Sequence, residues 1–174
     1  MDTSIVSKAL TGFIKLRGRA SLKSKPATKL SGTFVDFAES GGKDTYTVGF
    51  GKKIILPDDI EKKKYYIAGY GENNPAKGVI DPQYAHAVWM DDNSGRGGGL
   101  FIALDIVGLL NKDVNKIREM LTDFKKETGC RSINVFSTHN HAGIDTMGIW
   151  GPLPFSGKNE KFMQELFDAV LFSA

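Results

Sequence analysis

Residues 100–108 read Leu-Phe-Ile-Ala-Leu-Asp-Ile-Val-Gly and residues 132–138 read Ser-Ile-Asn-Val-Phe-Ser-Thr, two apolar runs separated by a charged segment. Both runs are rich in aliphatic, β-branched and aromatic residues, a composition that favours strands. The segment between them carries apolar residues at helical spacing, at Val114, Ile117, Leu121 and Phe124. Asn111 is expected to cap this helix, and Gly129 is expected to end it.

A strand, a helix and a second strand in this order predict a βαβ unit, whose crossover is right-handed and whose two strands run parallel. We therefore expect the α/β class, with a mixed β-sheet and helices packed on the sheet. The central strands are placed at 100–106 and 132–138, and the helix that joins them at 111–127.

The rest of the chain adds elements on both sides of this unit. Residues 45–51 and 84–90 have strand composition, and Pro57 closes the continuation of the first run. The glycine-rich residues 91–99 lack the Gly-Lys-Ser/Thr ending of a P-loop and precede a strand, so they predict a hairpin loop. A final helix is expected from about Lys158, with one apolar face formed by Phe162, Leu166 and Val170.

Polar groups gather directly after the run 132–138, where the sequence reads Thr138-His139-Asn140-His141-Ala142-Gly143. On an extended backbone, residues two apart project to the same face, so His139 and His141 can address one metal or ligand. A strand that delivers polar groups at its carboxyl end is how open α/β sheets build sites. Two solvated loop histidines are the alternative interpretation of the same pattern.

The predicted topology brings two further residues to this place. Parallel strands end at the same edge of a sheet, so Asp105 and His139 should share one rim. Pairing of the hairpin strands places His86 near the same rim, on a face that the register decides. Asp105 is either a partner of a metal-bound histidine or a carboxylate bonded to backbone amides, and His86 is best read as a packed strand histidine. Cys130 precedes the strand at its other end, which excludes it as a ligand.

Composition describes one ordinary globular domain of 174 residues, with 41% hydrophobic and 25% charged residues. The single Cys130 cannot form an internal disulfide. No apolar run reaches the ~20 residues that a membrane span needs. Lys8 and Lys15 interrupt the one apolar stretch near the start, which argues against a signal peptide. A cytoplasmic or membrane-peripheral location is therefore expected.

Residues 1–44 form a predicted peripheral arm of basic character, and the folded domain is placed at 45–174. Seven basic residues and one acidic residue lie before Ser31, and the remaining chain carries sixteen basic and nineteen acidic residues. Apolar residues between Ile5 and Ile14 recur at helical spacing and allow one short amphipathic helix. A solvated leader is favoured, and peripheral contact with an anionic membrane surface is the alternative. No motif for nucleic-acid binding is present, so no such partner is expected.

Taken in order, these pieces resemble the N-terminal catalytic domain of the neutral/alkaline non-lysosomal ceramidase family, in a bacterial branch of it. The resemblance covers roughly residues 46–172. It is carried by Val48-Gly49-Phe50-Gly51-Lys52, Gly69-Tyr70-Gly71, the run from Asp81 to Asp92, Leu104-Asp105, Ser137-Thr138-His139-Asn140-His141-Ala142-Gly143 and the run from Asp145 to Pro152.

The resemblance implies a zinc-dependent amidase that hydrolyses an N-acyl amide bond of a lipid-like substrate. It implies that His139 ligates Zn²⁺ and that His141 faces the substrate beside the metal. Zinc lowers the pKa of bound water to about 7 and so makes hydroxide available to attack an amide carbonyl. A neighbouring imidazole can then hydrogen-bond the developing oxyanion. Asp105 is the third residue predicted for this site.

The sequence departs from the family pattern at two positions. Ile80 stands where the family often has a histidine, and His86 stands where it usually has an arginine. The substrate side of the site is therefore not expected to match N-acyl sphingosine by default. A rival interpretation is a metallo-β-lactamase-like hydrolase, because Thr-His-x-His also opens that signature. That signature continues x-Asp-His, whereas Gly143 and Ile144 occupy those positions here.

A non-catalytic fragment is the remaining alternative. The family's other zinc ligands, a histidine, a glutamate and a tyrosine, come later in its chain and have no counterpart in these residues. Asp105 or Asp145 would complete only a weak metal site. The sequence also ends on the apolar face of its last helix. We therefore expect residues 1–174 alone to be an N-terminal part of a larger domain, with weak zinc binding, no amidase turnover and poor solubility.

Overall fold

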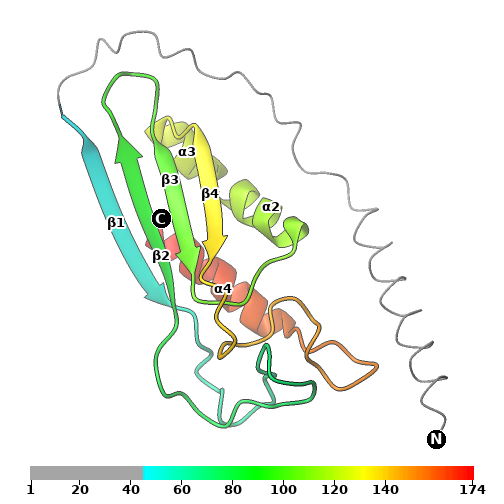
Figure 1. Ribbon diagram of the computed structural model, residues 1–174. Coiled ribbons are helices and arrows are strands. Elements are labelled where there is room, and N and C mark those ends of the chain that lie inside the picture. Colours follow the sequence, from blue (N-terminus) through cyan, green and yellow to red (C-terminus); the bar gives the residue numbers. More distant parts are fainter. Residues whose placement is uncertain (1–44) are drawn as a thin grey trace, which may run out of the picture. The chain divides into compact units, whose positions relative to one another are not determined.

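The computed structural model of the protein describes residues 45–174. The basic arm and the amphipathic helix predicted for residues 1–44 lie outside the described residues. Seven elements follow one another in the described part (Figure 1): β1 (Thr47–Ile54), β2 (Tyr84–Asp91), β3 (Gly99–Leu104), α2 (Asn111–Met120), α3 (Thr122–Thr128), β4 (Ser132–Ser137) and α4 (Glu160–Ser173).

The four strands form one mixed sheet in the order β1-β2-β3-β4. β1 pairs antiparallel with β2, and β2 pairs antiparallel with β3. β3 and β4 run parallel, with Leu104 opposite Ser137. The α/β class and the βαβ unit predicted from the sequence are therefore confirmed, and the carboxyl ends of β3 and β4 meet at one edge of the sheet.

The crossover differs from the predicted single helix in two details. Leu121 interrupts it with φ −90° and ψ 17°, so the structure has α2 and α3 in place of one helix over 111–127. The backbone bonds Leu121 N–H to Ile117 O (3.1 Å) and Lys125 N–H to Leu121 O (3.0 Å) continue across this point, which makes it a kink. The side chain of Leu121 is buried there.

The ends of the crossover test the two capping predictions. The prediction that Asn111 caps the helix is wrong, because Leu110 occupies the cap position and its carbonyl accepts the N–H of Asp113 (2.9 Å). Asn111 is the first helical residue and faces solvent. Gly129 ends α3 in the left-handed conformation, as predicted.

The glycine-rich residues between β2 and β3 form the predicted hairpin loop. A Cβ atom on Gly98 would lie 2.5 Å from the ring of Trp89 and 2.5 Å from the carbonyl of Met90, so this position requires glycine. The Trp89 ring meets Phe124 of α3 edge to face, with ring centroids 5.5 Å apart. Gly98 therefore makes room for packing between strand and helix.

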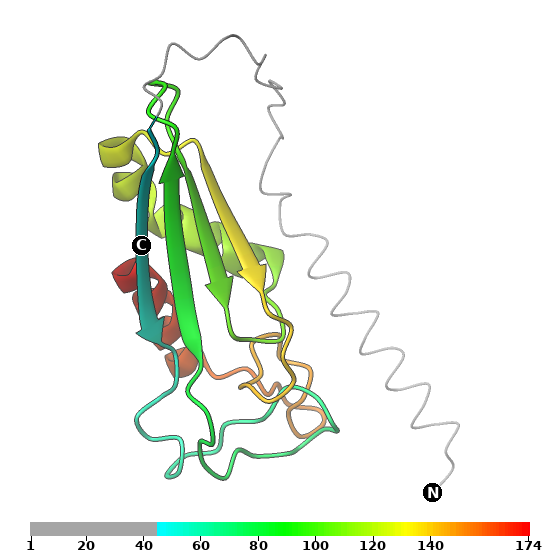
Figure 2. The same ribbon diagram turned by 60° about the vertical axis from the view of Figure 1, so that its left-hand side comes forward.

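One face of the sheet carries the core of the described domain. Figures 1 and 2 show α2, α3 and α4 together on this side. Alternate strand residues are buried here, as strand geometry requires, and they pack against the apolar faces of the helices: Ala85 and Ala87 of β2, Leu100, Ile102 and Leu104 of β3, Ile133 of β4, Ile117 of α2, and Phe162, Leu166 and Val170 of α4. The apolar face predicted for the last helix is therefore confirmed.

The opposite face of the sheet is covered by no helix among residues 45–174. Six large apolar side chains on this face are exposed: Val48, Phe50, Ile54, Met90, Phe101 and Phe136. Phe50 is 89% exposed, and the rings of Phe101 and Phe136 stack on each other with centroids 6.4 Å apart. We call these six residues the open face.

Two polar clusters join the helical layer to neighbouring loops: Asp113 of α2 pairs with Lys158, and Asp59 pairs with Lys161 of α4. The Lys158 ammonium group lies 2.7 Å from the Asp113 carboxylate of α2, and both side chains are 9% exposed. The Tyr65 hydroxyl donates to Asp59 Oδ1 at 2.5 Å. That hydrogen bond and those from Lys63 and Lys161 hold the pKa of Asp59 well below its usual range. Burial, reinforced by the Asp59 bond, raises the pKa of Tyr65 to about 12.

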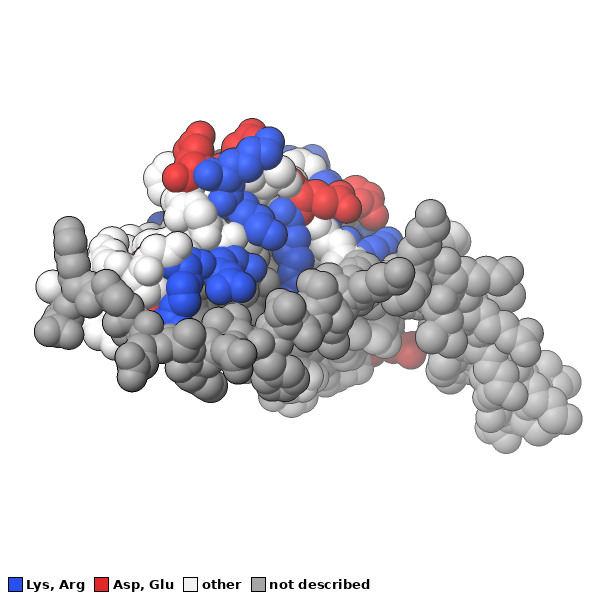
Figure 3. Space-filling view, turned by 90° about the horizontal axis from the view of Figure 1, so that it is seen from above, with Lys and Arg blue, Asp and Glu red and all other residues white. Residues whose placement is uncertain are grey.

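Seen from the hairpin end of the sheet, basic and acidic side chains lie next to one another (Figure 3). Arg96 pairs with Asp92 at 2.5 Å and Lys126 pairs with Asp123 at 3.1 Å. Exposed pairs of this kind contribute little to stability. Within the described residues, every helix is too short or too polar to cross a membrane.

Candidate functional site

The site begins where the chain leaves β4. The N–H of Thr138 donates to Leu104 O (2.9 Å) and the N–H of His139 donates to Ile106 O (3.1 Å), so the chain follows the segment after β3 for two more residues. His139 has φ +60°, a left-handed conformation that non-glycine residues seldom adopt and that is often found at functional sites. These bonds place His139 and Asp105 on the same rim of the sheet at the level of the backbone.

The imidazole of His139 has one nitrogen engaged by the protein. Nδ1 lies 2.7 Å from Val107 O, and a carbonyl oxygen can only accept a hydrogen bond, so Nδ1 carries the hydrogen. In the neutral ring, Nε2 then presents its lone pair. His139 is an exposed residue, so this nitrogen lies on a ring within reach of solvent. An N–H bonded to a backbone carbonyl is the usual support of a metal-ligating histidine.

His141 lies against His139 and within a ring of aromatic residues. The two imidazoles meet edge to face with centroids 4.9 Å apart. Tyr70 and Trp150 each contact the His141 ring edge to face, both with centroids 6.1 Å away. His141 is half-buried, whereas Tyr70 is 90% exposed. The structure therefore brings the two predicted histidines together, with His141 as the more enclosed of the two.

Gly69 forms the floor beneath His141. Its φ is +117°, and a Cβ atom at this position would lie within 3 Å of three atoms of the His141 side chain. The N–H of Asn73, four residues after Gly69, donates to Trp150 O (3.0 Å), which joins the loop after Gly69 to the loop that carries Trp150. Only glycine fits at position 69 while the His141 ring keeps this place.

Asp145 follows His141 by four residues and is fully buried. Its Oδ1 accepts the N–H groups of Met147 (2.9 Å) and Gly148 (2.6 Å), and its Oδ2 accepts the N–H of Trp150 (2.9 Å). Both carboxylate oxygens are thus occupied by backbone amides. The expectation that Asp145 could complete a weak metal site does not fit this bonding.

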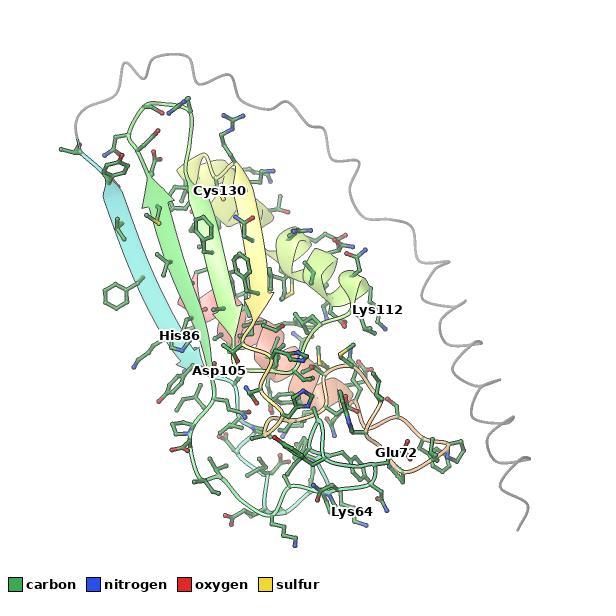
Figure 4. All side chains as sticks on the ribbon, viewed as in Figure 1. Lys64, Glu72, His86, Asp105, Lys112 and Cys130 are labelled. Atoms are coloured by element: carbon green, nitrogen blue, oxygen red, sulfur yellow. The ribbon has the colours of Figure 1, made fainter. Side chains whose placement is uncertain are left out.

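Asp105 contacts the neighbouring strand. Its Oδ2 accepts the N–H of Tyr84 at 3.0 Å and lies 3.8 Å from His86 Nε2. His86 in turn stands beside the Tyr84 ring, with centroids 5.4 Å apart. Figure 4 shows His86 and Asp105 together at the lower ends of β2 and β3. Both residues lie on the side of the sheet that carries the open face, because the alternate residues Ala85 and Leu104 are buried under the helices.

Cys130 lies at the other end of the sheet, before β4 begins (Figure 4). Its Sγ–H donates to Ser132 O at 3.2 Å, and burial raises the pKa of the thiol. A buried thiol of raised pKa is a poor metal ligand, because metals bind the thiolate. Its position agrees with its exclusion from the site.

The donor set of the described residues is small. Among residues 45–174, His, Cys, Asp and Glu side chains form no group of three or more that could hold a metal ion. A catalytic zinc usually takes three protein ligands. His139 fits the role of one such ligand through Nε2, and the described part of the chain supplies no complete set.

Comparison with known proteins gives structural neighbours only. No protein-family model matches the chain, and no curated protein matches it. A neutral ceramidase from Pseudomonas aeruginosa superposes with a TM-score of 0.60 and 19% identity, over 75% of this chain and 21% of that one. A structure of ceramidase complexed with C2 superposes with a TM-score of 0.59 and 16% identity, over 75% and 20%.

The fold therefore resembles that of ceramidase structures, and this chain spans about a fifth of their length. The likeness agrees with the resemblance read from the sequence motifs. At these identities it establishes the arrangement of the backbone alone.

Sequence reasoning missed part of the surroundings of His141. Trp150 and Gly69 were noted only as family motif residues, and their contact with His141 was not predicted. The sequence Gly69-Tyr70-Gly71 was the available signal, since glycines on both sides of an aromatic residue indicate a turn. In the structure all three residues have positive φ. Neither residue could be assigned to His141 without knowing that the two loops meet.

Proposed function

We propose that this chain is part of a ceramidase-like hydrolase that uses Zn²⁺ to hydrolyse an N-acyl amide bond of a lipid-like substrate. The observation that supports the proposal most is the state of His139. Its Nδ1–H is held by Val107 O, which leaves Nε2 for a metal, and it follows a strand end in a fold shared with ceramidases. Zinc bound there supplies an activated water for attack on an amide carbonyl.

The remaining residues take roles that their positions allow. His141 is the proposed substrate-side group, because its ring lies 4.9 Å from that of His139 and is oriented by three aromatic neighbours. An imidazole placed there can hydrogen-bond an oxyanion. Asp105, predicted from the sequence as a catalytic residue beside His141, is proposed to act by position, since its Oδ2 accepts the Tyr84 N–H at the rim of the site. The complete metal set requires ligands beyond those that the described residues supply.

The test uses the longest natural polypeptide that contains residues 1–174. Bound zinc is measured by elemental analysis, and turnover is measured on a fluorogenic N-acyl amide, a β-lactam and a thioester. We expect zinc and amide turnover in the wild type, and loss of both in His139→Ala. His86→Ala is the matched control, since it removes the third histidine on the same rim and should retain the zinc.

Two further outcomes make the assignment specific. His141→Ala should retain zinc and lower kcat by about 10²–10³-fold, the usual loss for an oxyanion-stabilising group. The 174-residue chain alone is expected to bind zinc weakly and to hydrolyse no amide. A metal-free protein with full amidase activity would refute the zinc proposal, and turnover of the β-lactam alone would favour the rival hydrolase.

A further inference from the structure

A buried carboxylate that takes no part in the proposed chemistry binds the backbone of Trp150, whose ring contacts His141. Asp145 is 0% exposed and sits four residues after His141. Burying a carboxylate is costly unless hydrogen bonds replace the water it loses. Here three backbone N–H groups supply those bonds, and they belong to one short loop that ends at Trp150.

The backbone around Asp145 is held from the other side. The N–H of Asp145 donates to Tyr66 O (2.8 Å), and Ile144 pairs with Ile67 in an isolated antiparallel bridge. The hydroxyl of Thr146, itself fully buried, donates to Gly108 O at 2.5 Å. The backbone of Asp145 is thus held in place, and its carboxylate binds the backbone of the loop from Met147 to Trp150.

The two carboxylate oxygens have different tasks. Oδ1 accepts from Met147 and Gly148, which closes the turn, whereas Oδ2 accepts from Trp150. Trp150 is also held on its carbonyl side, where Asn73 N–H donates at 3.0 Å. Its ring then meets the His141 ring at an interplanar angle of 85°. The indole that contacts the His141 ring therefore belongs to a residue whose backbone N–H is bound by Asp145 Oδ2.

Close packing at the carboxylate supports the same conclusion. A Cβ atom on Gly157 would lie 2.4 Å from Asp145 Oδ2, so the later loop packs closely against this oxygen. Oδ2, on a side chain with no exposed surface, is the acceptor of the Trp150 N–H. A buried N–H that loses its acceptor there is left unsatisfied.

We propose that Asp145 is a positioning residue that holds Trp150 against His141 through its Oδ2, and so fixes the enclosed face of His141. Its effect on a reaction rests on the proposed function, whereas its effect on Trp150 does not. The role is distinct from metal binding, because both oxygens are occupied by backbone donors.

The substitution Asp145→Asn tests the proposal because it keeps the size of the side chain. The amide oxygen can replace Oδ1 for Met147 and Gly148, and the NH₂ group then faces the Trp150 N–H, donor against donor. Native-state hydrogen exchange is measured amide by amide in the full 174-residue chain. We expect exchange at Trp150 to rise about 10- to 100-fold relative to the global opening rate, with much smaller changes at Met147 and Gly148.

Thr146→Val is the matched control. It removes the buried hydroxyl bond of the adjacent residue at nearly constant volume, so it weakens the same loop without changing the acceptor of Trp150. It should raise exchange at residues 145–148 together. In a Trp89→Phe background, the fluorescence of Trp150 should shift and become open to acrylamide quenching in Asp145→Asn only.

The outcomes separate the proposal from a general structural role. If Asp145→Asn and Thr146→Val change exchange and fluorescence in the same pattern, Asp145 stabilises the loop without positioning Trp150, and the inference is wrong. If Asp145→Asn fails to fold, the variants Trp150→Phe and Trp150→Ala are compared instead. An altered environment of the His141 ring, measured by NMR, is expected in the alanine variant alone. All these readouts are independent of zinc and of amide turnover.

Discussion

The two faces of the sheet are built from the same strands and meet different surroundings. On the covered face, side chains such as Ile102 are fully buried among residues from three helices of the described domain. On the open face, Phe50 is 89% exposed and Phe136 is 53% exposed. Burial of apolar surface is the main favourable term in folding, at about 25 cal/mol per Å². An apolar residue on a strand therefore does not by itself indicate a core contact.

The largest difference is expected from matched phenylalanine truncations. Phe162→Ala removes a ring that is 0% exposed and meets Tyr65 edge to face at 6.4 Å, and it should cost about 3–5 kcal/mol of unfolding free energy. Phe50→Ala, on the open face, should change it by no more than about 0.5 kcal/mol. Urea unfolding with equal m-values checks both. Equal losses would show that the open face is covered in solution.

The second effect concerns the layer of helices that makes the covered face. Lys158→Met leaves the Asp113 carboxylate without its cation at a position only 9% exposed, and we expect a loss of about 2–3 kcal/mol. Lys62→Met, at an exposed lysine, serves as the control and should be nearly neutral. The double variant Asp113→Asn with Lys158→Met should recover part of the loss, because no unpaired charge then remains.

A smaller effect on the free energy of unfolding is expected at alkaline pH from Tyr65, a buried residue of the core on the covered face. The folded-state pKa of Tyr65 is about 12, above its usual value of 10, so folding favours the protonated hydroxyl. Its contribution is complete below pH 10 and is lost as the pH rises toward 12. Tyr65→Phe should lower stability at neutral pH by about 1 kcal/mol and flatten the alkaline decline. An unchanged decline would assign the loss to another group.

The smallest change in stability, and the largest in solubility, is expected on the open face itself. An exposed apolar patch on a sheet promotes association. Phe101→Ser combined with Phe136→Ser should reduce concentration-dependent association in light scattering and leave the urea midpoint within about 0.5 kcal/mol of wild type. Association that persists unchanged would show that another surface of the protein mediates it.

The sequence predicted the elements whose periodicity is local. Parallel pairing of β3 and β4 followed from strand, helix and strand in succession, and the buried positions of α4 followed from helical spacing. The helix start was wrong by one residue because a cap depends on which carbonyl the turn presents, and Leu110 presents it. The open face was not predicted, since Phe50 and Phe101 look as apolar as residues of a core.

At the site, sequence reasoning reached the two histidines and the shared rim. It did not reach the partners of His141, because Gly69, Tyr70 and Trp150 lie on loops that meet only in three dimensions. It also placed Asp145 as a candidate ligand. From the sequence alone, any carboxylate is a possible metal ligand. Only the structure shows that three backbone amides donate hydrogen bonds to this one.

The spacing of the strands along the chain has a consequence for the order in which the sheet assembles. Seven residues connect β2 to β3, whereas twenty-seven residues connect β3 to its parallel partner β4. Closing the longer connection costs about 1 kcal/mol more in chain entropy. Contacts of low sequence separation are therefore expected to form early in the transition state, and φ-values should be higher at Ala87 and Ile102 than at Ile133. The rim that carries His139 would then be among the last parts of the sheet to close.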